Sequence, residues 1–143
     1  MHSKQKGNIA FSSVVLELQK HEFNVFSEIG DYSRVDLIAE KNNILKKIQI
    51  KFSGESEEKM ILNLEKSGPN GYRYNYSEKD VDWFALYSPY AEKIAWVKAS
   101  EACPHSRQFI VRIKEPKNKQ TQNLHMLEDY GVDKFEADFE MAP

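Results

Sequence analysis

The chain has 143 residues, a formal net charge of −2, and 41% hydrophobic against 29% charged residues, which suits one domain with its own core. No apolar run approaches the ~20 residues that a membrane helix needs, and the polar residues 1–8 contain no secretory signal. The single cysteine, Cys103, excludes an internal disulfide and a cysteine-based zinc site, so we expect a cytoplasmic protein with no membrane and no disulfide partner.

The first part of the chain contains one predicted helix and three predicted strands. Residues 7–22 have a broad apolar face at helical spacing, and residues 23–29 alternate in a way that indicates a strand. A turn is expected at Gly30-Asp31. The β-rich segments 35–40 and 44–52 are separated by three polar residues and are expected to form a hairpin.

The rest of the chain is dominated by short strands. Strands are expected at residues 60–64, 72–76, 83–87, 94–98 and 108–114, a short helix or turn at 100–105, and a last helix at 121–130. Residues 55–79 are expected to form an inserted hairpin, and residues 131–143 an acidic C-terminal tail, either frayed or used for subunit contacts. A helix followed by mostly antiparallel strands indicates a single α+β domain over residues 1–143, with a mixed central sheet flanked by helices.

The register of the first hairpin gathers polar residues on one face. If Asn42-Asn43 is a two-residue turn, Lys41 lies opposite Ile44, and paired residue numbers sum to about 85 along the ladder. One face then carries Arg34, Asp36, Gln49 and Lys51. The other face, the expected core face, carries Val35, Leu37, Ala39, Ile48 and Ile50.

Asp36, Gln49 and Lys51 therefore converge near one end of the hairpin. Carboxylate and amide oxygens suit Mg²⁺, which proteins hold through one or two carboxylates together with waters and substrate phosphates. A lysine beside them can neutralise charge on a scissile phosphate and orient the attacking water. The alternative is a solvent-facing hairpin with an Asp–Lys surface pair worth ~0–1 kcal/mol, and the spacing by itself leaves both interpretations open.

Lys6-Gly7 opens the first predicted helix, and residues 30–36 (GDYSRVD) and 48–51 (IQIK) contain the candidate site. With residues 82–87 and 116–120, these stretches resemble the PD-(D/E)XK nuclease superfamily, and within it the small homing endonucleases encoded by cyanobacterial group I introns. The resemblance implies a restriction-endonuclease-like core and a Mg²⁺ site. It also implies the roles: Asp36 binds the metal, Gln49 replaces the usual Glu or Asp, the Ile50 backbone carbonyl faces the metal, and Lys51 is the family lysine.

One position departs from the family pattern. The resemblance places a metal-site glutamate on the first helix, four residues after the glycine of the Lys-Gly pair, and this position is Phe11. A phenyl ring cannot bind Mg²⁺ or hold a metal-linked water, and Gln49 is neutral, so Asp36 is the only charged ligand left. We therefore expect Phe11 to impair cleavage; the alternative is that Phe11 is a core residue and the alignment is shifted by one.

Basic residues gather in two stretches, 41–79 and 93–119, which together carry 15 basic and 7 acidic residues, whereas residues 120–143 sum to −5. Phosphate affinity depends on such local patches more than on the total charge. The residues expected to contact DNA are Arg34, Lys46, Lys47 and Ser53 near the metal site, and Lys59, Lys66, Tyr72, Arg73, Tyr74 and Asn75 on the inserted hairpin. Solvated basic faces, and tyrosines that pack on a neighbouring subunit, are the alternatives.

The resemblance, together with these patterns, implies a site-specific double-stranded DNA endonuclease of the homing type that hydrolyses phosphodiester bonds with Mg²⁺. One site of this kind cuts one strand, so we expect a homodimer or a dimer of dimers. Other possibilities stay open: a DNA-binding module without cleavage, a restriction-type or Holliday-junction-resolving nuclease, and a protein-interaction domain in which Asp36, Gln49 and Lys51 are surface residues.

Overall fold

The first helix, α1 (Ser3–Lys20), begins four residues before the expected start at Gly7. The cause is local: the N-cap His2 accepts a hydrogen bond from the Lys4 N–H (3.2 Å), and the Gln5 side chain accepts one from the His2 N–H (3.0 Å). This reciprocal pair satisfies two free donors at the helix start. The residues that α1 buries are Ala10, Val14 and Leu18. The computed structural model describes residues 1–67, 69–105, 107–118 and 124–140.

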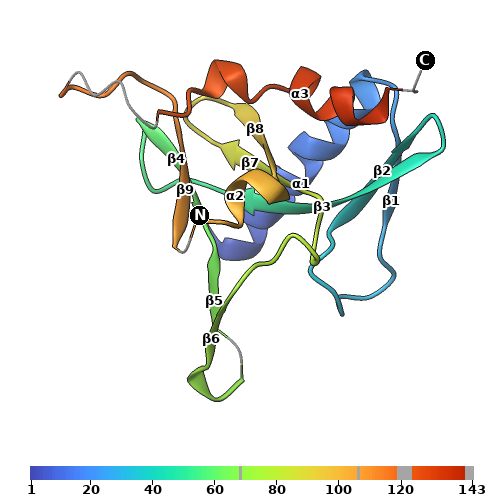
Figure 1. Cartoon of the computed structure of the whole chain (residues 1–143), viewed down its shortest axis with the longest axis horizontal. Coiled ribbons are helices and arrows are strands. Elements are labelled where there is room, and N and C mark those ends of the chain that lie inside the picture. The colour runs from blue at the N-terminus through green and yellow to red at the C-terminus, as the bar shows by residue number, and fades with distance from the viewer. Residues whose placement is uncertain (68, 106, 119–123, 141–143) are drawn as a thin grey trace.

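A five-stranded sheet forms the centre of the molecule, with strand order β1-β2-β3-β7-β8 (Figure 1). Its strands are β1 (Asn24–Ser27), β2 (Leu37–Lys41), β3 (Ile44–Phe52), β7 (Trp83–Ser88) and β8 (Lys93–Lys98). The β3–β7 pair is parallel and the other three pairs are antiparallel. The prediction of an α+β fold with a mixed central sheet is therefore confirmed.

The β2–β3 hairpin has the predicted register, with Leu37 opposite Ile48 and Ile38 opposite Lys47. Both turn residues have left-handed backbone angles, with φ of 55° at Asn42 and 64° at Asn43. Asparagine tolerates this conformation better than most residues, and two such residues in succession make the tight turn whose twist matches antiparallel strands. The turn chemistry therefore determines which residues of β3 face which side of the sheet.

A second layer covers one face of the central sheet, and its pairing differs from the prediction. β4 (Lys59–Asn63) pairs antiparallel with β9 (Gln108–Arg112), far away in the sequence. Only β5 (Glu65–Ser67) and β6 (Arg73–Asn75), which flank the short helix η1 (Pro69–Gly71), pair as a local hairpin, and it projects from the body of the molecule (Figure 1).

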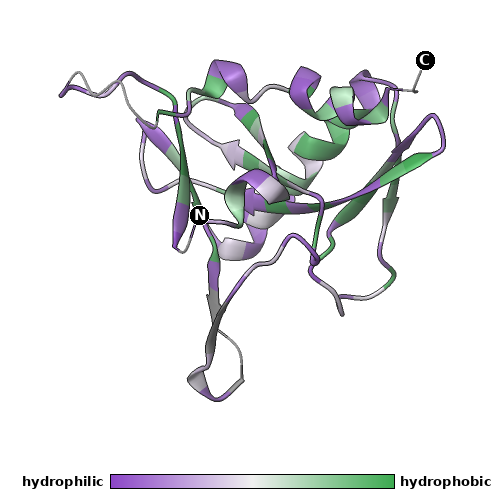
Figure 2. Ribbon diagram, viewed as in Figure 1, coloured by the Kyte–Doolittle hydropathy of each residue, from purple (hydrophilic) through white to green (hydrophobic). Residues whose placement is uncertain are grey.

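Two hydrophobic clusters lie on opposite faces of the central sheet, because successive side chains of β7 and β8 alternate between them. The first, beneath β4, β9 and α2 (Ala99–Ala102), includes Met60, Leu62, Phe84, Leu86, Val97, Phe109 and Val111. The second, beneath α1, includes Val14, Leu18, Ile48, Trp83, Trp96, Phe135 and Phe139. Hydrophobic segments accordingly follow both the sheet and the inner side of α1 (Figure 2).

The C-terminal segment is helical and packed, not frayed, as far as Glu140. It contains η2 (Leu127–Asp129), α3 (Val132–Glu136) and η3 (Ala137–Phe139), and Phe135 and Phe139 are fully buried. Asp138 accepts a hydrogen bond from the Trp83 indole (2.8 Å), which ties the segment to β7. The expected helix over 121–130 is wrong for its described part, which has only the single turn η2; residues 121–123 lie outside the described residues. None of the described helices is long and apolar enough to span a bilayer.

Candidate active site

The middle of β3 sends alternate side chains into two different environments. Ile48 and Ile50 join the cluster beneath α1, whereas Gln49 and Lys51 point to the other face of the sheet. Gln49 is only 8% exposed, so the predicted polar face is not a solvent-facing surface at this position. A buried polar side chain is costly unless it is paired, which marks this stretch as a candidate site.

Asp36 is held against the backbone of β3 just before β2 begins. Its N–H donates to the Ile48 carbonyl (2.9 Å), and its Oδ2 accepts from the Ile50 N–H (2.7 Å). The carboxylate therefore takes the place of a backbone partner and lies on the strand beside Gln49. Regular strand pairing starts only at Leu37, so Val35 does not follow the alternation of side chains along β2. Val35 packs on the first cluster and not, as predicted, on the same face as Leu37.

The loop before Asp36 is organised by Glu28. Its carboxylate accepts hydrogen bonds from the Tyr32 N–H (2.7 Å), the Ser33 N–H (3.2 Å) and the Ser33 hydroxyl. The Ser33 hydroxyl bond is the main cause that lowers the pKa of Glu28. Gly30 has a φ of +100°, a backbone angle that residues with a Cβ rarely adopt, so a substitution there would strain the loop. This explains the GDYS stretch in structural terms.

Gln49 carries a buried acceptor that lacks a partner. Among the described residues, no group donates a hydrogen bond to Gln49 Oε1, although the atom is shielded from solvent. An unsatisfied buried acceptor costs about 1–3 kcal/mol, so an oxygen-seeking cation beside Asp36 would relieve that cost. The donor set fits a metal ion in this respect. No cluster of three or more His, Cys, Asp or Glu residues that could hold a metal occurs in the described ranges.

Lys51 is positioned by a tyrosine that the sequence did not single out as a site residue. Its Nζ donates to the Tyr76 hydroxyl (3.1 Å) and lies 5.0 Å from the centre of the Tyr76 ring. Tyr76 is 3% exposed and packs edge-on against Phe84, with ring centroids 5.6 Å apart. The lysine is therefore oriented by a fixed group, not by a mobile surface residue.

Arg34 contacts the same tyrosine and is itself restrained. Its guanidinium lies 5.2 Å from the centre of the Tyr76 ring and donates to Asp80 Oδ2 (2.7 Å). Asp80 also accepts from the Ser77 N–H (2.8 Å), which closes the loop that follows Tyr76. Tyr76 and Asp80 escape sequence analysis because the alternating tyrosines suggest an exposed ribbon; only burial distinguishes Tyr76 from Tyr72, which is 78% exposed.

Phe11 lies on α1, the helix that packs against β3, and it is 37% exposed. It belongs to neither hydrophobic cluster, so core packing does not explain a phenylalanine at this position. Five residues earlier, the Lys6 ammonium lies 5.8 Å from the centre of the ring of Phe52, the residue that follows Lys51 at the end of β3. The start of α1 thus runs beside the end of β3 that carries the candidate site.

The predicted DNA contacts fall into separate places. Lys47 shares a face with Gln49, whereas Lys46 points to the opposite face because strand side chains alternate. The prediction that Ser53 contacts DNA is wrong, because this residue is only 1% exposed. Its hydroxyl donates a hydrogen bond to the Glu55 carboxylate (3.0 Å) and accepts one from the Ile61 N–H (2.8 Å). Of the other predicted DNA contacts, Lys59 begins β4, Tyr72 directly precedes β6, and Asn75 ends β6. The side chains of Lys66, Arg73 and Tyr74 lie outside the described part of the structure.

A sequence model of the PD-(D/E)XK endonuclease family matches residues 1–133. The chain belongs to this family. Nucleases of this family generally use divalent metal ions, and the candidate site offers oxygen atoms of Asp36 and Gln49 that suit such an ion. No curated protein sequence matches the chain.

Two solved structures share the fold of this PD-(D/E)XK nuclease. I-Ssp6803I, a bacterial homing endonuclease, is similar with a TM-score of 0.76 and 20% identity over 99% of this chain and 100% of that chain. Hjc, a Holliday junction resolvase from Archaeoglobus fulgidus, is similar with a TM-score of 0.50 and 16% identity over 77% and 84%. At these identities the likeness is one of architecture, namely a restriction-endonuclease-like core.

Proposed function

We propose that this PD-(D/E)XK nuclease is a site-specific, homing-type endonuclease that hydrolyses phosphodiester bonds of double-stranded DNA with Mg²⁺. The observation that carries the proposal is the buried Gln49 Oε1, which has no hydrogen-bond partner among the described residues and lies one residue from the Ile50 N–H that holds the Asp36 carboxylate. Asp36, Gln49 and the Ile50 backbone carbonyl are the oxygen donors assigned to the metal. When bound, the ion supplies Lewis-acid stabilisation of the phosphate and a more acidic water.

Lys51 carries the positive charge assigned to the reacting phosphate. Its ammonium group neutralises charge that develops on the phosphate oxygens, and the Tyr76 hydroxyl holds that group in place beforehand. Arg34 is fixed by Asp80 beside the same ring and provides a second cation for the DNA backbone. Preorganisation of this kind reduces the cost of ordering side chains when substrate binds.

Phe11 is the residue that we expect to limit this activity. An aromatic ring at the position of the family glutamate leaves Asp36 as the only charged ligand, and a hard cation binds through charge as well as geometry. Metal occupancy and water activation should both fall as a result. The chain is therefore proposed to bind DNA and to cleave it poorly.

Cutting both strands at a defined stagger requires two sites related by twofold symmetry, so the proposed assembly is a homodimer or a dimer of dimers. The contacts assigned to DNA are Arg34, Lys47, Lys59, Lys66, Tyr72, Arg73, Tyr74 and Asn75. The β5–β6 hairpin, which projects from the body, has the shape of a ribbon that enters a groove of the duplex (Figure 1).

The test is DNA cleavage with Mg²⁺ by three proteins: the natural chain, Phe11→Glu, and Phe11→Glu combined with Lys51→Ala. We expect discrete double-strand products from Phe11→Glu, at a rate at least about 10²-fold above the other two proteins. Titration of Mg²⁺ by calorimetry gives an independent readout, because Phe11→Glu should also tighten metal binding. Unchanged metal affinity and unchanged cleavage in Phe11→Glu would contradict the assignment of this position.

Two alternative functions are supported by particular observations. The likeness to an archaeal Holliday junction resolvase favours a resolving nuclease, which would cut four-way junctions regardless of sequence. Neutral Gln49 and Phe11, at positions where the resemblance places acidic ligands, favour a module that binds DNA without cutting it. Cleavage assays with a linear duplex and a four-way junction distinguish all three: site-specific duplex products, junction products, or binding alone.

A further inference from the structure

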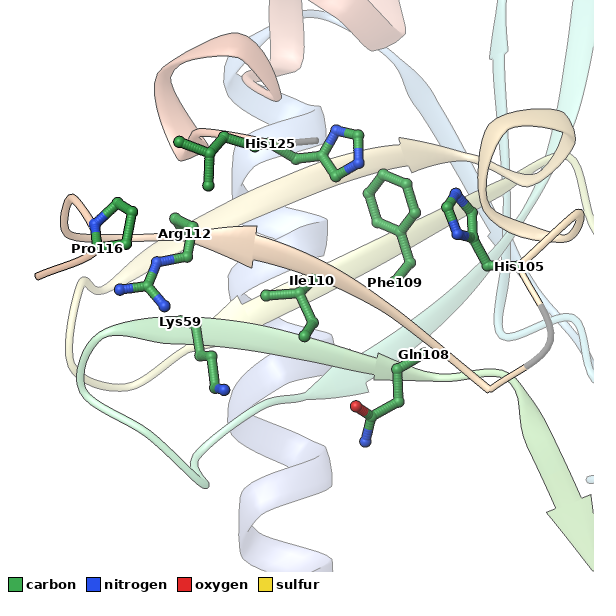
Figure 3. A pocket seen from close by; sticks show the side chains of 9 residues that line it. Lys59, His105, Gln108, Phe109, Ile110, Arg112, Pro116 and His125 are labelled. Atoms are coloured by element: carbon green, nitrogen blue, oxygen red, sulfur yellow. The ribbon is translucent and has the colours of Figure 1, made fainter. Parts of the chain in front are cut away.

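A groove of about 500 Å³ lies on the outer face of the β4–β9 pair (Figure 3), and its lining residues include none of Asp36, Gln49 and Lys51. The side chains of Phe109 and Val111 point inward to the first cluster, so their neighbours on β9 point outward. The residues that line the groove are Lys59, His105, Gln108, Phe109, Ile110, Arg112, Pro116, Leu124 and His125. No carboxylate is among these described lining residues, although the whole chain is slightly acidic.

Two permanent cations face one another across this strand pair. Lys59 and Arg112 are directly opposite in the β4–β9 register, so their side chains leave the same face side by side (Figure 3). Like charges in opposite positions of an antiparallel pair destabilise the sheet. The only acidic contact that the described residues give this pair is Glu58, which is 4.0 Å from Arg112 and 44% exposed. An arrangement that costs stability in the free protein suggests an anionic ligand.

The far wall of the groove is made of stacked aromatic rings. The His125 ring stacks on Phe109, with centroids 4.4 Å apart, and His105 meets the same ring edge-on at 5.3 Å. The Tyr130 hydroxyl donates to Glu101 (2.9 Å), so it accepts from His125 Nδ1 (2.9 Å). Burial raises the pKa of Tyr130, which keeps this proton on the tyrosine. His125 is thereby held as a fixed wall opposite the two cations.

A second groove of about 360 Å³ provides a contrast within the same molecule. It lies between the end of α1 and the start of β8, and it also contains two lysines, Lys20 and Lys93. Its lining includes two carboxylates, Glu17 and Glu92, which offset that charge. Two lysines beside two carboxylates give no net attraction for an anion, whereas the Lys59–Arg112 groove keeps a net positive charge, with two cations on its lining and one nearby carboxylate, Glu58, at 4.0 Å from Arg112.

We propose that the Lys59–Arg112 groove binds the phosphate backbone of DNA as a site separate from the cleavage site; this inference rests on the proposed function of the chain as a DNA nuclease. The two cations are spaced as cross-strand neighbours and each contacts a phosphate oxygen. Gln108 and the histidine wall border the same strand of nucleic acid without reading its bases. The groove anchors DNA outside the segment that is cut.

The test is binding of a mixed-sequence duplex, measured by fluorescence anisotropy across a salt series in the presence of EDTA so that cleavage plays no part. Loss of two phosphate contacts should lower the slope of log affinity against log salt by about 1.8, and weaken binding about 60-fold at ~0.1 M salt. This result is expected for Lys59→Gln combined with Arg112→Gln. The matched control, Lys20→Gln with Lys93→Gln, removes the same charge from the other groove and should change affinity less than about 2-fold.

Lys59→Gln alone separates binding from folding. It should weaken DNA binding about 8-fold at the same salt, since it removes one contact, while the melting temperature of the free protein stays the same or rises because the like-charge pair is relieved. If both groove variants bind as tightly as the natural chain, or the control loses as much affinity, the groove proposal is overturned. If the natural chain binds no DNA, the groove proposal and the proposed function both fail; if it binds DNA but Phe11→Glu does not cut, the proposed function fails alone.

Discussion

The two faces of β3 serve different purposes within four residues of sequence. On one face, Ile48 and Ile50 pack beneath α1 with Trp83, Phe135 and other aromatic residues, and the indole N–H groups of Trp83 and Trp96 there are hydrogen-bonded. On the other, Gln49 has a buried oxygen without a described partner, and Lys51 is held by a tyrosine. The comparison shows how a single strand can combine a stabilising face with a face kept ready for charge, at some cost in stability.

The largest effect on stability is expected from the apolar face. Ile48 is fully buried among large side chains, so Ile48→Ala should lower the free energy of unfolding by about 2–5 kcal/mol through lost burial and the cavity left behind. Denaturant unfolding measures this loss. DNA affinity of the folded fraction should be unchanged; a large loss of affinity at equal folded fraction would mean that the two faces are not independent.

The neighbouring residue should behave in the opposite way. Gln49→Leu removes an unsatisfied buried acceptor at similar volume, so the protein should be more stable by up to about 1–3 kcal/mol and should lose metal binding. Gln49→Glu adds a second carboxylate and should bind Mg²⁺ more tightly, at a cost in stability when no metal is present. Thermal melting with and without Mg²⁺ tests both variants, and a destabilised Gln49→Leu would show that the amide is structural.

Tyr76 joins the functional face to the core, and its hydroxyl can be removed without its ring. Tyr76→Phe should cost about 0.5–1.5 kcal/mol of stability, the value of one hydrogen bond, while the edge-on contact with Phe84 is kept. In the Phe11→Glu background, its main effect should be a lower kcat, since Lys51 is less well oriented. A change in KM alone, with kcat preserved, would contradict the proposal that Tyr76 positions Lys51 for catalysis.

The smallest effect concerns a carboxylate on the apolar side. Burial raises the pKa of Glu17, only partly offset by the hydrogen bond that its Oε2 accepts from the Trp96 indole (2.9 Å). A carboxyl group whose pKa is raised in the folded state stabilises the protein fully when the pH is below its ordinary pKa of 4.5. This contribution to the free energy of unfolding is lost as the pH rises through the folded-state pKa. Glu17→Gln should therefore reduce the fall in melting temperature between acidic and neutral pH. A pH profile identical to that of the natural chain would argue against this.

Local features of the sequence were sufficient to predict the first hairpin and its register, and with it the positions of Asp36, Gln49 and Lys51 along the two strands. The two asparagines of the turn and the alternation of β3 act between neighbours, so register and facing follow from short-range sterics. The same information could not identify Tyr76 or Asp80, whose roles depend on contacts with Lys51 and Arg34 that are remote in sequence. It also misplaced Ser53, because a hydroxyl after a polar strand is exposed or buried according to what packs over it.

The sequence by itself therefore determined the α+β class, the hairpin register and the juxtaposition of Asp36, Gln49 and Lys51, since each depends on backbone geometry within a short stretch. Tertiary structure alone decided that β4 pairs with β9, that Val35 leaves the face of Leu37, and that the acidic C-terminal segment packs as a helix. Strand partners and burial depend on contacts between distant segments, and many pairings satisfy the same pattern of apolar residues until the whole core is assembled.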